Sequence, residues 1–331
     1  MGWVRFLTFG WVLVACSCGA RTELGGVIAG SDGGQPCNAV PWVVFDYEGE
    51  QSSGIAAMRA DGSSFHMLDL GGMRGWNPSV SPDGTLLFYV VAPSDGSNAL
   101  MVRNLVTSQT RTFLQITVQP PSNGLEKASV SPDGKLVAYE LIPDIHLASI
   151  DGSNDRVLVS GPYDPNGLPY GYGHPAFSPD SQTVYFSTIG LLESIRIDGS
   201  ARQTLEQDQF FTNPSIPDFS FPNASLSPDG TELVAQIACD VAELRVFPIG
   251  SLPGDPCTVG TKLVEVGTSQ AFDEASNPSW GPTQIVYDDD KDLFLIDPIG
   301  GAPTNLTQSV TTADSSFAAD PVWAPACTEL P

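Results

Sequence analysis

One short phrase recurs six times along this chain, and its spacing restricts the folds that the chain can adopt. The phrase centres on Ser-Pro-Asp-Gly, and its prolines are Pro82, Pro132, Pro179, Pro228, Pro282 and Pro325. Successive prolines are 50, 47, 49, 54 and 43 residues apart. The last two copies, at 277–282 and 320–325, keep the proline but lose the Asp-Gly pair. A period of this length is typical of stacked supersecondary units.

Each copy predicts a turn that is followed by a strand. Proline presets the backbone at the second position of a type I turn, and glycine accepts the positive φ that ends it. The runs that follow, such as 86–91 and 136–139, are apolar on both faces, which is typical of a strand covered on two sides. Asp-Gly pairs at 151–152 and 198–199 then predict hairpin turns before a weaker fourth strand. The unit is therefore a four-stranded antiparallel blade of a β-propeller.

The two ends of the chain complete each other. The first strand pattern, 42–47, has no such phrase before it, and the last phrase, 320–325, has no strands after it. We therefore predict that 320–325 forms the innermost strand of the first blade. The expected fold is all-β, a six-bladed β-propeller over 42–325 whose ring is closed by the C-terminal strand. Closure removes exposed sheet edges.

The phrases resemble the TolB-type (PD40, WD40-like) propeller repeat, whose consensus reads Pro-Ser-Trp-Ser-Pro-Asp-Gly before an apolar strand and an Asp-Gly turn. Trp280 and Trp323 stand at the tryptophan position of that consensus. The resemblance covers roughly 42–325 and implies the propeller fold. TolB proteins carry an α/β domain before the propeller, whereas about twenty Gly-rich residues precede it here. The chain thus resembles the repeat family without that domain, and a propeller fold alone does not imply a function.

The first residues are typical of an export signal. Arg5 precedes a ten-residue apolar stretch, which is too short to cross a bilayer as a helix. Leu13-Val14-Ala15-Cys16 resembles a lipobox, so we expect a signal peptide at 1–15 and lipidation of Cys16. The alternatives are an ordinary secretory signal or lipidation of Cys18. We expect a flexible tether at 16–41 and a C-terminal tail at 326–331.

The chain is strongly acidic, with 38 Asp and Glu against 14 Lys and Arg and a formal net charge of −24. This balance argues against nucleic-acid binding, which requires clustered basic residues, and against anionic lipid surfaces. The lipid is therefore the expected membrane link, in a bacterial cell envelope, on the periplasmic or the surface side.

Export also makes disulfides plausible. Cys37 lies before the first strand and Cys327 after the last, so a bridge between them would staple the ring shut. Cys239 and Cys257 are then left to each other by elimination.

The residues that open the six phrases are equivalent in the repeat. If they begin the innermost strands, they gather at one mouth of the central channel. They are Asn77, Lys127, His174, Asn223, Asn277 and Asp320. The alternative is that they only cap strand ends by hydrogen bonding. Two aromatic loops, 160–173 and 208–222, are candidate recognition surfaces through Tyr163, Tyr170, Tyr172, Phe210 and Phe211.

Signals for catalysis are few. No Gly-x-Ser-x-Gly nucleophile elbow occurs, and His66, His146 and His174 are dispersed over different blades. An enzyme needs converging titratable groups with shifted pKa values, and the expected mouth offers few. Asp288, Asp290 and Asp292 could bind Ca²⁺ from one loop, but they lack the central Gly and distal Glu of an EF-hand, so we favour a solvated acidic turn.

Together these features predict a non-catalytic envelope lipoprotein without cofactor, whose propeller binds a protein or peptide through the channel mouth and the adjacent loops. The alternative is a glycan receptor or glycan-degrading enzyme that uses the same mouth.

Overall fold

The computed structural model describes residues 40–50, 52–93, 96–117, 124–161, 173–188, 191–207, 224–238, 242–249, 260–265, 277–289, 291–312, 316–326, 328 and 330. These residues belong to one compact unit, Cys37–Pro331. No helix in the described part of the chain is long and apolar enough to cross a membrane.

The described residues form strands alone, joined by turns. The strands are β1 (Trp42–Glu48), β2 (Ser53–Arg59), β3 (His66–Met67), β4 (Trp76–Val80), β5 (Leu86–Val91), β6 (Ser97–Asn104), β7 (Thr110–Thr117), β8 (Leu125–Val130), β9 (Leu136–Leu141), β10 (Asp144–Ser149), β11 (Arg156–Val159), β12 (Gly173–Phe177), β13 (Thr183–Thr188), β14 (Leu191–Arg196), β15 (Gln203–Gln207), β16 (Ala224–Leu226), β17 (Glu232–Ala238), β18 (Ala242–Pro248), β19 (Thr261–Glu265), β20 (Ser279–Trp280), β21 (Ile285–Asp288), β22 (Leu293–Ile296), β23 (Thr304–Asn305) and β24 (Phe317–Ala324).

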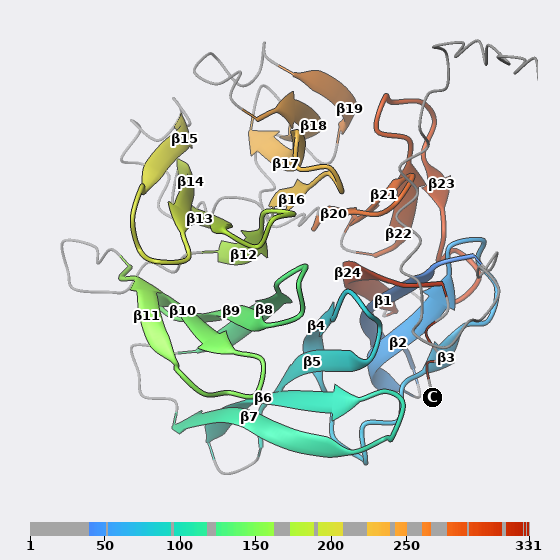
Figure 1. The fold of residues 1–331 in the computed structure, drawn as a ribbon. Helices are drawn as coiled ribbons and strands as arrows, with labels where there is room; N and C mark the ends of the chain where they lie inside the picture. Colours follow the sequence, from blue (N-terminus) through green and yellow to red (C-terminus); the bar gives the residue numbers. More distant parts are fainter. Residues whose placement is uncertain are drawn as a thin grey trace, which may run out of the picture. The chain divides into compact units, whose positions relative to one another are not determined.

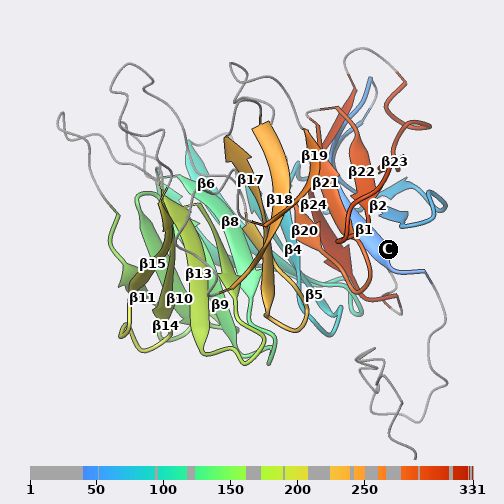
Figure 2. The same ribbon diagram turned by 90° about the horizontal axis from the view of Figure 1, so that it is seen from above.

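These strands make six four-stranded antiparallel sheets, the blades of a β-propeller. Five blades use four consecutive strands each, from β4–β7 to β20–β23, and the blade that we number first has the order β24-β1-β2-β3. The strands β24, β4, β8, β12, β16 and β20 are innermost and surround the centre of the ring (Figure 1). Seen from above, the strands of neighbouring blades stand side by side with their turns at the two ends (Figure 2). The predicted fold class is confirmed.

The ring is closed as the ends of the sequence predicted. β24 pairs antiparallel with β1, from Trp42 opposite Ala324 to Glu48 opposite Phe317. Arg59 strengthens this closure, because its Nη1 donates to the carbonyl oxygens of Val40 at 2.5 Å and Ala326 at 2.8 Å. The segments that precede β1 and follow β24 are thus held by one guanidinium group.

Apolar runs on both faces of the second strand explain how the blades hold together. In β5, Leu87 and Tyr89 pack toward the first blade, whereas Phe88 and Val90 pack toward the third. All four side chains are fully buried. Alternate residues of one strand therefore enter two different interblade cores, and burial of each large side chain contributes about 1.5–3 kcal/mol.

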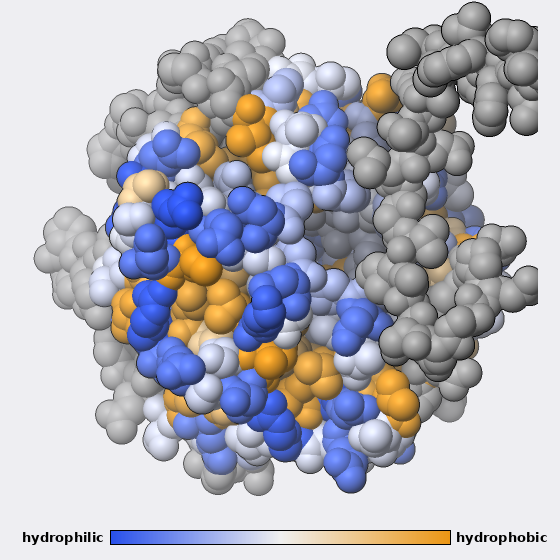
Figure 3. All heavy atoms as spheres, in the orientation of Figure 1, coloured by the Kyte–Doolittle hydropathy of each residue, from blue (hydrophilic) through white to orange (hydrophobic). Residues whose placement is uncertain are grey.

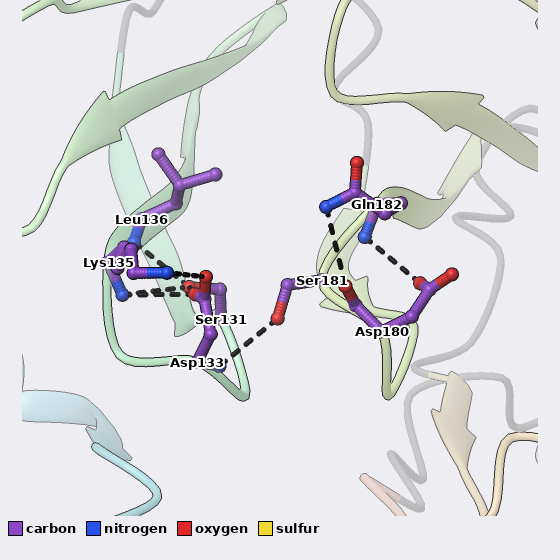
Figure 4. A network of polar contacts seen from close by, with 7 residues as sticks. All are labelled: Ser131, Asp133, Lys135, Leu136, Asp180, Ser181 and Gln182. Atoms are coloured by element: carbon purple, nitrogen blue, oxygen red, sulfur yellow. Dashed lines mark hydrogen bonds and ion pairs between the residues drawn. The ribbon is translucent and has the colours of Figure 1, made fainter.

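The Ser-Pro-Asp-Gly phrase builds the same turn wherever it occurs. Ser131 Oγ donates to Asp133 Oδ1 at 2.7 Å and accepts the backbone N–H of Leu136 at 2.9 Å. The turns also contact one another around the ring, since the backbone N–H of Asp133 donates to Ser181 Oγ in the next blade at 3.1 Å (Figure 4). Ser181 replaces the glycine of the phrase and still adopts φ 60°. A Cβ on Gly84, at φ +71°, would clash with Thr328 Oγ1 of the closing segment.

Candidate functional site

The innermost strands carry an irregularity at the end where the phrase begins. The pairing of β4 with β5 shifts between Trp76 and Ser79, and that of β12 with β13 shifts between Gly173 and Ala176. β24 has a matching irregularity opposite β1. The first residue inside each bulge adopts a left-handed backbone conformation, with φ 53° at Asn77, 43° at His174 and 51° at Asp320. Bulges re-aim groups out of the regular sheet ladder.

The freed backbone groups of these bulges are bound by carboxylates of the preceding blade. The N–H of Asn77 donates to Asp46 Oδ2 at 2.9 Å, and the N–H of Asp320 donates to Asp288 Oδ2 at 3.0 Å. The backbone of His174 is hydrogen-bonded to the carboxylate of Glu140 in the same way. The three acceptors, Asp46 in β1, Glu140 in β9 and Asp288 in β21, occupy equivalent places in the second strands of their blades. A recurring carboxylate clasp therefore links three pairs of neighbouring blades.

Side chains join these clasps into one polar network at the mouth. Asn277 Nδ2 donates to Asp288 Oδ2 at 2.9 Å, beside the bond from Asp320. Lys127 Nζ, in the third blade, lies 3.3 Å from Asp320 Oδ1 in the first blade. The adjacent Glu126 accepts a hydrogen bond of 3.2 Å from Asn77 Nδ2. The predicted mouth residues of blades that are not neighbours are thus brought into contact.

Burial of carboxyl groups dominates the electrostatics of the mouth, and repulsion between them adds to it. Burial raises the pKa of Asp288 to about 8, and repulsion from Asp320 adds to this effect. Burial and the charge of Glu126 raise the pKa of Glu140 to about 8. The pKa values of Asp46 and Glu126 are also raised, chiefly by burial.

His174 is held neutral in this environment. Burial lowers its pKa well below the ordinary value, and the nearby positive charge of Lys127 acts in the same direction. Part of the residue remains accessible, but its Nδ1 is buried and forms no hydrogen bond with the described residues.

The structure therefore brings together five of the six residues expected at the mouth, Asn77, Lys127, His174, Asn277 and Asp320, and Asn223 lies outside the described residues. Sequence reasoning missed the carboxylates Asp46, Glu126 and Glu140, and it considered Asp288 only as a Ca²⁺ candidate and not as part of the mouth. The expectation that few titratable groups with shifted pKa values converge here is wrong. An alignment of the six repeats would have shown a carboxylate at one position of the second strand in three blades, followed 31 to 34 residues later by the residue it binds.

The acidic loop at 288–292, which was expected to be a solvated turn with Ca²⁺ binding as the alternative, is divided between two environments. Asp288 is fully buried rather than solvated, because Asn277 and Asp320 hold its carboxylate inside the mouth. Asp292 instead accepts hydrogen bonds from Asn305 and Thr307. Asp290 lies outside the described residues. Among the described His, Cys, Asp and Glu side chains, no group of three is placed to hold a metal ion.

The other two histidines lie away from the mouth. His66 is on the outermost strand of the first blade and stacks edge-on against Trp42, with ring centroids 5.4 Å apart. His146, on the third strand of its blade, shares Asp155 Oδ1 with Tyr139, at 3.1 Å and 2.6 Å respectively. Several predicted sites lie outside the described residues, namely Cys16, Cys37, Cys239, Cys257, Cys327, Tyr163, Tyr170, Tyr172, Phe210 and Phe211.

Comparison with known proteins gives the fold. No family model matches the chain, and no curated protein matches it. Among solved structures, TolB from Acinetobacter baumannii is similar, with a TM-score of 0.64 and 13% identity over 88% of this chain and 68% of that chain. A structure of the nidogen/laminin complex gives a TM-score of 0.56 and 13% identity over 86% and 99% of the two chains. A puromycin hydrolase gives 0.51 and 14% identity over 81% and 45%. At these identities the likeness is one of fold: this chain is a six-bladed β-propeller similar in fold to TolB.

Proposed function

We propose that the chain is a bacterial envelope lipoprotein, anchored through Cys16, whose propeller binds a protein or peptide partner at the channel mouth without catalysis. The observation that supports this most directly is the network at the mouth. Lys127 and Asp320 come from blades that are not neighbours, and they meet among side chains that the repeats place at the ends of the innermost strands. The mouth thereby concentrates hydrogen-bonding groups from several blades at one place.

Two further observations support a binding role. The loops 160–173 and 208–222 connect β11 to β12 and β15 to β16, so each leads directly into an innermost strand at the mouth end. One of the similar folds belongs to a structure of the nidogen/laminin complex, in which a propeller is crystallised with a protein partner. Hydrophilic and hydrophobic side chains are interleaved on the face seen in Figure 3, and this mixture by itself does not distinguish an interface from the rest of a protein surface.

The proposed site is tested by crosslinking from defined positions in living cells. Arg74 precedes β4 and its side chain is 60% exposed, so it can be replaced by a photo-crosslinking amino acid without disturbing the mouth. The matched control is Gln182, an exposed residue beyond the turn at the opposite end of β12. We expect one protein to be crosslinked reproducibly from position 74 and not from position 182. Equal yields from both positions, or none from position 74, would contradict the proposed site.

One observation favours the enzyme alternative enough to keep it under test. Glu140 and Asp288 have pKa values near 8, as a general acid at neutral pH requires. Both carboxylates, however, already bind a backbone N–H of the next blade, and this structural role accounts for their burial. We therefore expect no product when the protein is incubated with envelope glycans. Hydrolysis that is lost in Glu140→Gln would overturn the non-catalytic assignment.

A further inference from the structure

The mouth holds more acidic groups than its described basic side chains can balance. Five carboxyl groups contribute to the network, from Asp46, Glu126, Glu140, Asp288 and Asp320. The cation that acts on the carboxyl groups of Asp46, Glu140 and Asp288 is in each case Lys127. One ammonium group therefore serves several carboxyl groups that lie on three different blades.

The contact that Lys127 makes is loose. Its Nζ is 3.3 Å from Asp320 Oδ1, which is the longest separation among the ion pairs of the described residues. Charge-assisted N–H···O bonds are normally about 2.7–2.9 Å long. The Lys127 and Asp320 side chains remain 14% and 21% exposed, so both can be reached from solvent. The pair is thus accessible and is not held at its optimum.

Two acceptors in the same network lack a donor. Asp288 is fully buried, and its Oδ1 accepts no hydrogen bond from the described residues, although its Oδ2 accepts two. Asp46 Oδ1 is buried and unpaired in the same way. Leaving a buried carboxyl oxygen without a partner is unfavourable, and a protonated amine in the mouth would favour the ionised form that accepts its N–H bonds.

We propose that the mouth is a receptor site for a protonated amine, which binds beside Asp320 in the place that Lys127 occupies in the free protein. The inference rests on the proposed function and makes it more specific, since the partner would insert a lysine side chain or the amine of its N-terminus. Lys127 then acts as an internal stand-in for the ligand. An amine suits this site because it can donate several N–H bonds to separate carboxylates. A metal ion suits it less, since no three of the described His, Cys, Asp and Glu side chains are placed to hold one.

The test measures how the purified protein binds small blocked amino acids, by calorimetry at low ionic strength. Acetyl-lysine-methylamide carries the side-chain amine, glycylglycinamide carries an N-terminal amine, and acetyl-norleucine-methylamide is the neutral control. Lys127→Met removes the internal competitor, so we expect it to bind an amine about tenfold or more tightly than the wild type, as one charge-assisted hydrogen bond would give. The amine that binds more tightly indicates whether the partner supplies a lysine side chain or its N-terminus.

Two further variants make the test specific. Lys135→Met removes a lysine that is 77% exposed and pairs with Asp133 in a turn at the other end of the ring, so it should leave amine affinity unchanged. Lys127→Met combined with Asp320→Asn should lose the gain, because the anion is removed while asparagine still tolerates the left-handed φ of position 320. Far-UV circular dichroism verifies folding, and Lys127→Gln replaces Lys127→Met if the latter fails to fold.

The outcomes separate this inference from the proposed function. Equal amine affinity in the wild type and in both Lys127 variants, or equal binding of the norleucine compound, overturns the amine site. A partner that still crosslinks from position 74 would in that case leave the proposed function standing. Amine binding that follows the expected pattern, in a protein with no crosslinked partner, would support the site and contradict the protein-binding role.

Discussion

The carboxylate clasp at Asp288 makes a prediction about stability that is opposite to ordinary acid denaturation. Asp288→Asn keeps an oxygen that can accept the N–H of Asp320 and the amide of Asn277, the two bonds that Oδ2 now accepts. It removes an ionisable group from a fully buried position. We therefore expect the stability of this variant, relative to that of the wild type, to rise as the pH increases from 5 to 7.

The sign follows from the pKa values of the two states. Burial and Asp320 raise the pKa of Asp288 from 3.8 to about 8 in the folded protein, and unfolding restores an ordinary value. Between these values the folded state keeps a proton that the unfolded state has lost, so the stabilising contribution is full below the unfolded pKa and is lost as the pH rises toward the folded one. The slope is at most about 1.4 kcal/mol per pH unit. From pH 5 to pH 7 the wild type should thus lose up to about 2.7 kcal/mol more than the variant.

Urea unfolding at pH 5, 6, 7 and 8 measures the free energy of unfolding for both proteins. Asp180→Asn is the matched control, because the Ser178 hydroxyl lowers the pKa of that exposed carboxyl. Ionisation of Asp180 changes the stability only at pH values below the pKa of this carboxyl in the unfolded chain. The free energy of unfolding of Asp180→Asn should therefore run parallel to that of the wild type from pH 5 to pH 8. Parallel curves for Asp288→Asn and the wild type would refute the reasoning that burial and repulsion raise this pKa.

Three other predictions concern the closure of the ring. Gly84→Ala and Gly134→Ala both place alanine at φ near +70°, a cost of about 1–2 kcal/mol, but a Cβ meets the closing segment only at Gly84. Urea unfolding should therefore show a larger loss for Gly84→Ala, and equal losses would contradict the contact. Arg59→Ala removes two bonds to backbone carbonyls, worth about 1.5–3 kcal/mol each, and should expose the C-terminal segment to limited proteolysis. Peptide mapping without reductant should find Cys37 joined to Cys327 by a disulfide, because Arg59 binds the backbone close in sequence to each cysteine, at Val40 and at Ala326. Finding both cysteines as free thiols would exclude the bridge.

The repeats made the fold predictable because each step is local. Proline, aspartate and glycine set the turn within four residues, and Ser131 Oγ and its equivalents fix the start of the next strand. A strand that is apolar on both faces requires a neighbouring blade on each side. Phe88 and Tyr89 show this, because they enter two different interblade cores. Ring closure was predictable because the first blade lacked an innermost strand and the last phrase formed an innermost strand without a blade. The two pair with each other as β24 and β1.

The candidate site was predictable in part. The residues that open the phrases were expected at one mouth from their position in the repeat alone, and Lys127 and Asp320 meet there. Their partners were missed because a single carboxylate after an apolar run, such as Glu140 or Asp288, is also what an ordinary turn would have. The acidic loop at 288–292 showed this limit most clearly, since Asp288 and Asp292 are only four positions apart and contact different neighbours.

The sequence by itself therefore determined the blade, the number of blades and the closure, because these depend on turn chemistry and on patterns that repeat along the chain. Only the tertiary structure decided which carboxylates are buried, which of them bind the bulged backbone of the next blade, and that Lys127 reaches across to Asp320. The physical reason is that burial and charge interaction depend on distances between residues that are tens to hundreds of positions apart. Those distances are fixed by how the blades pack around the ring.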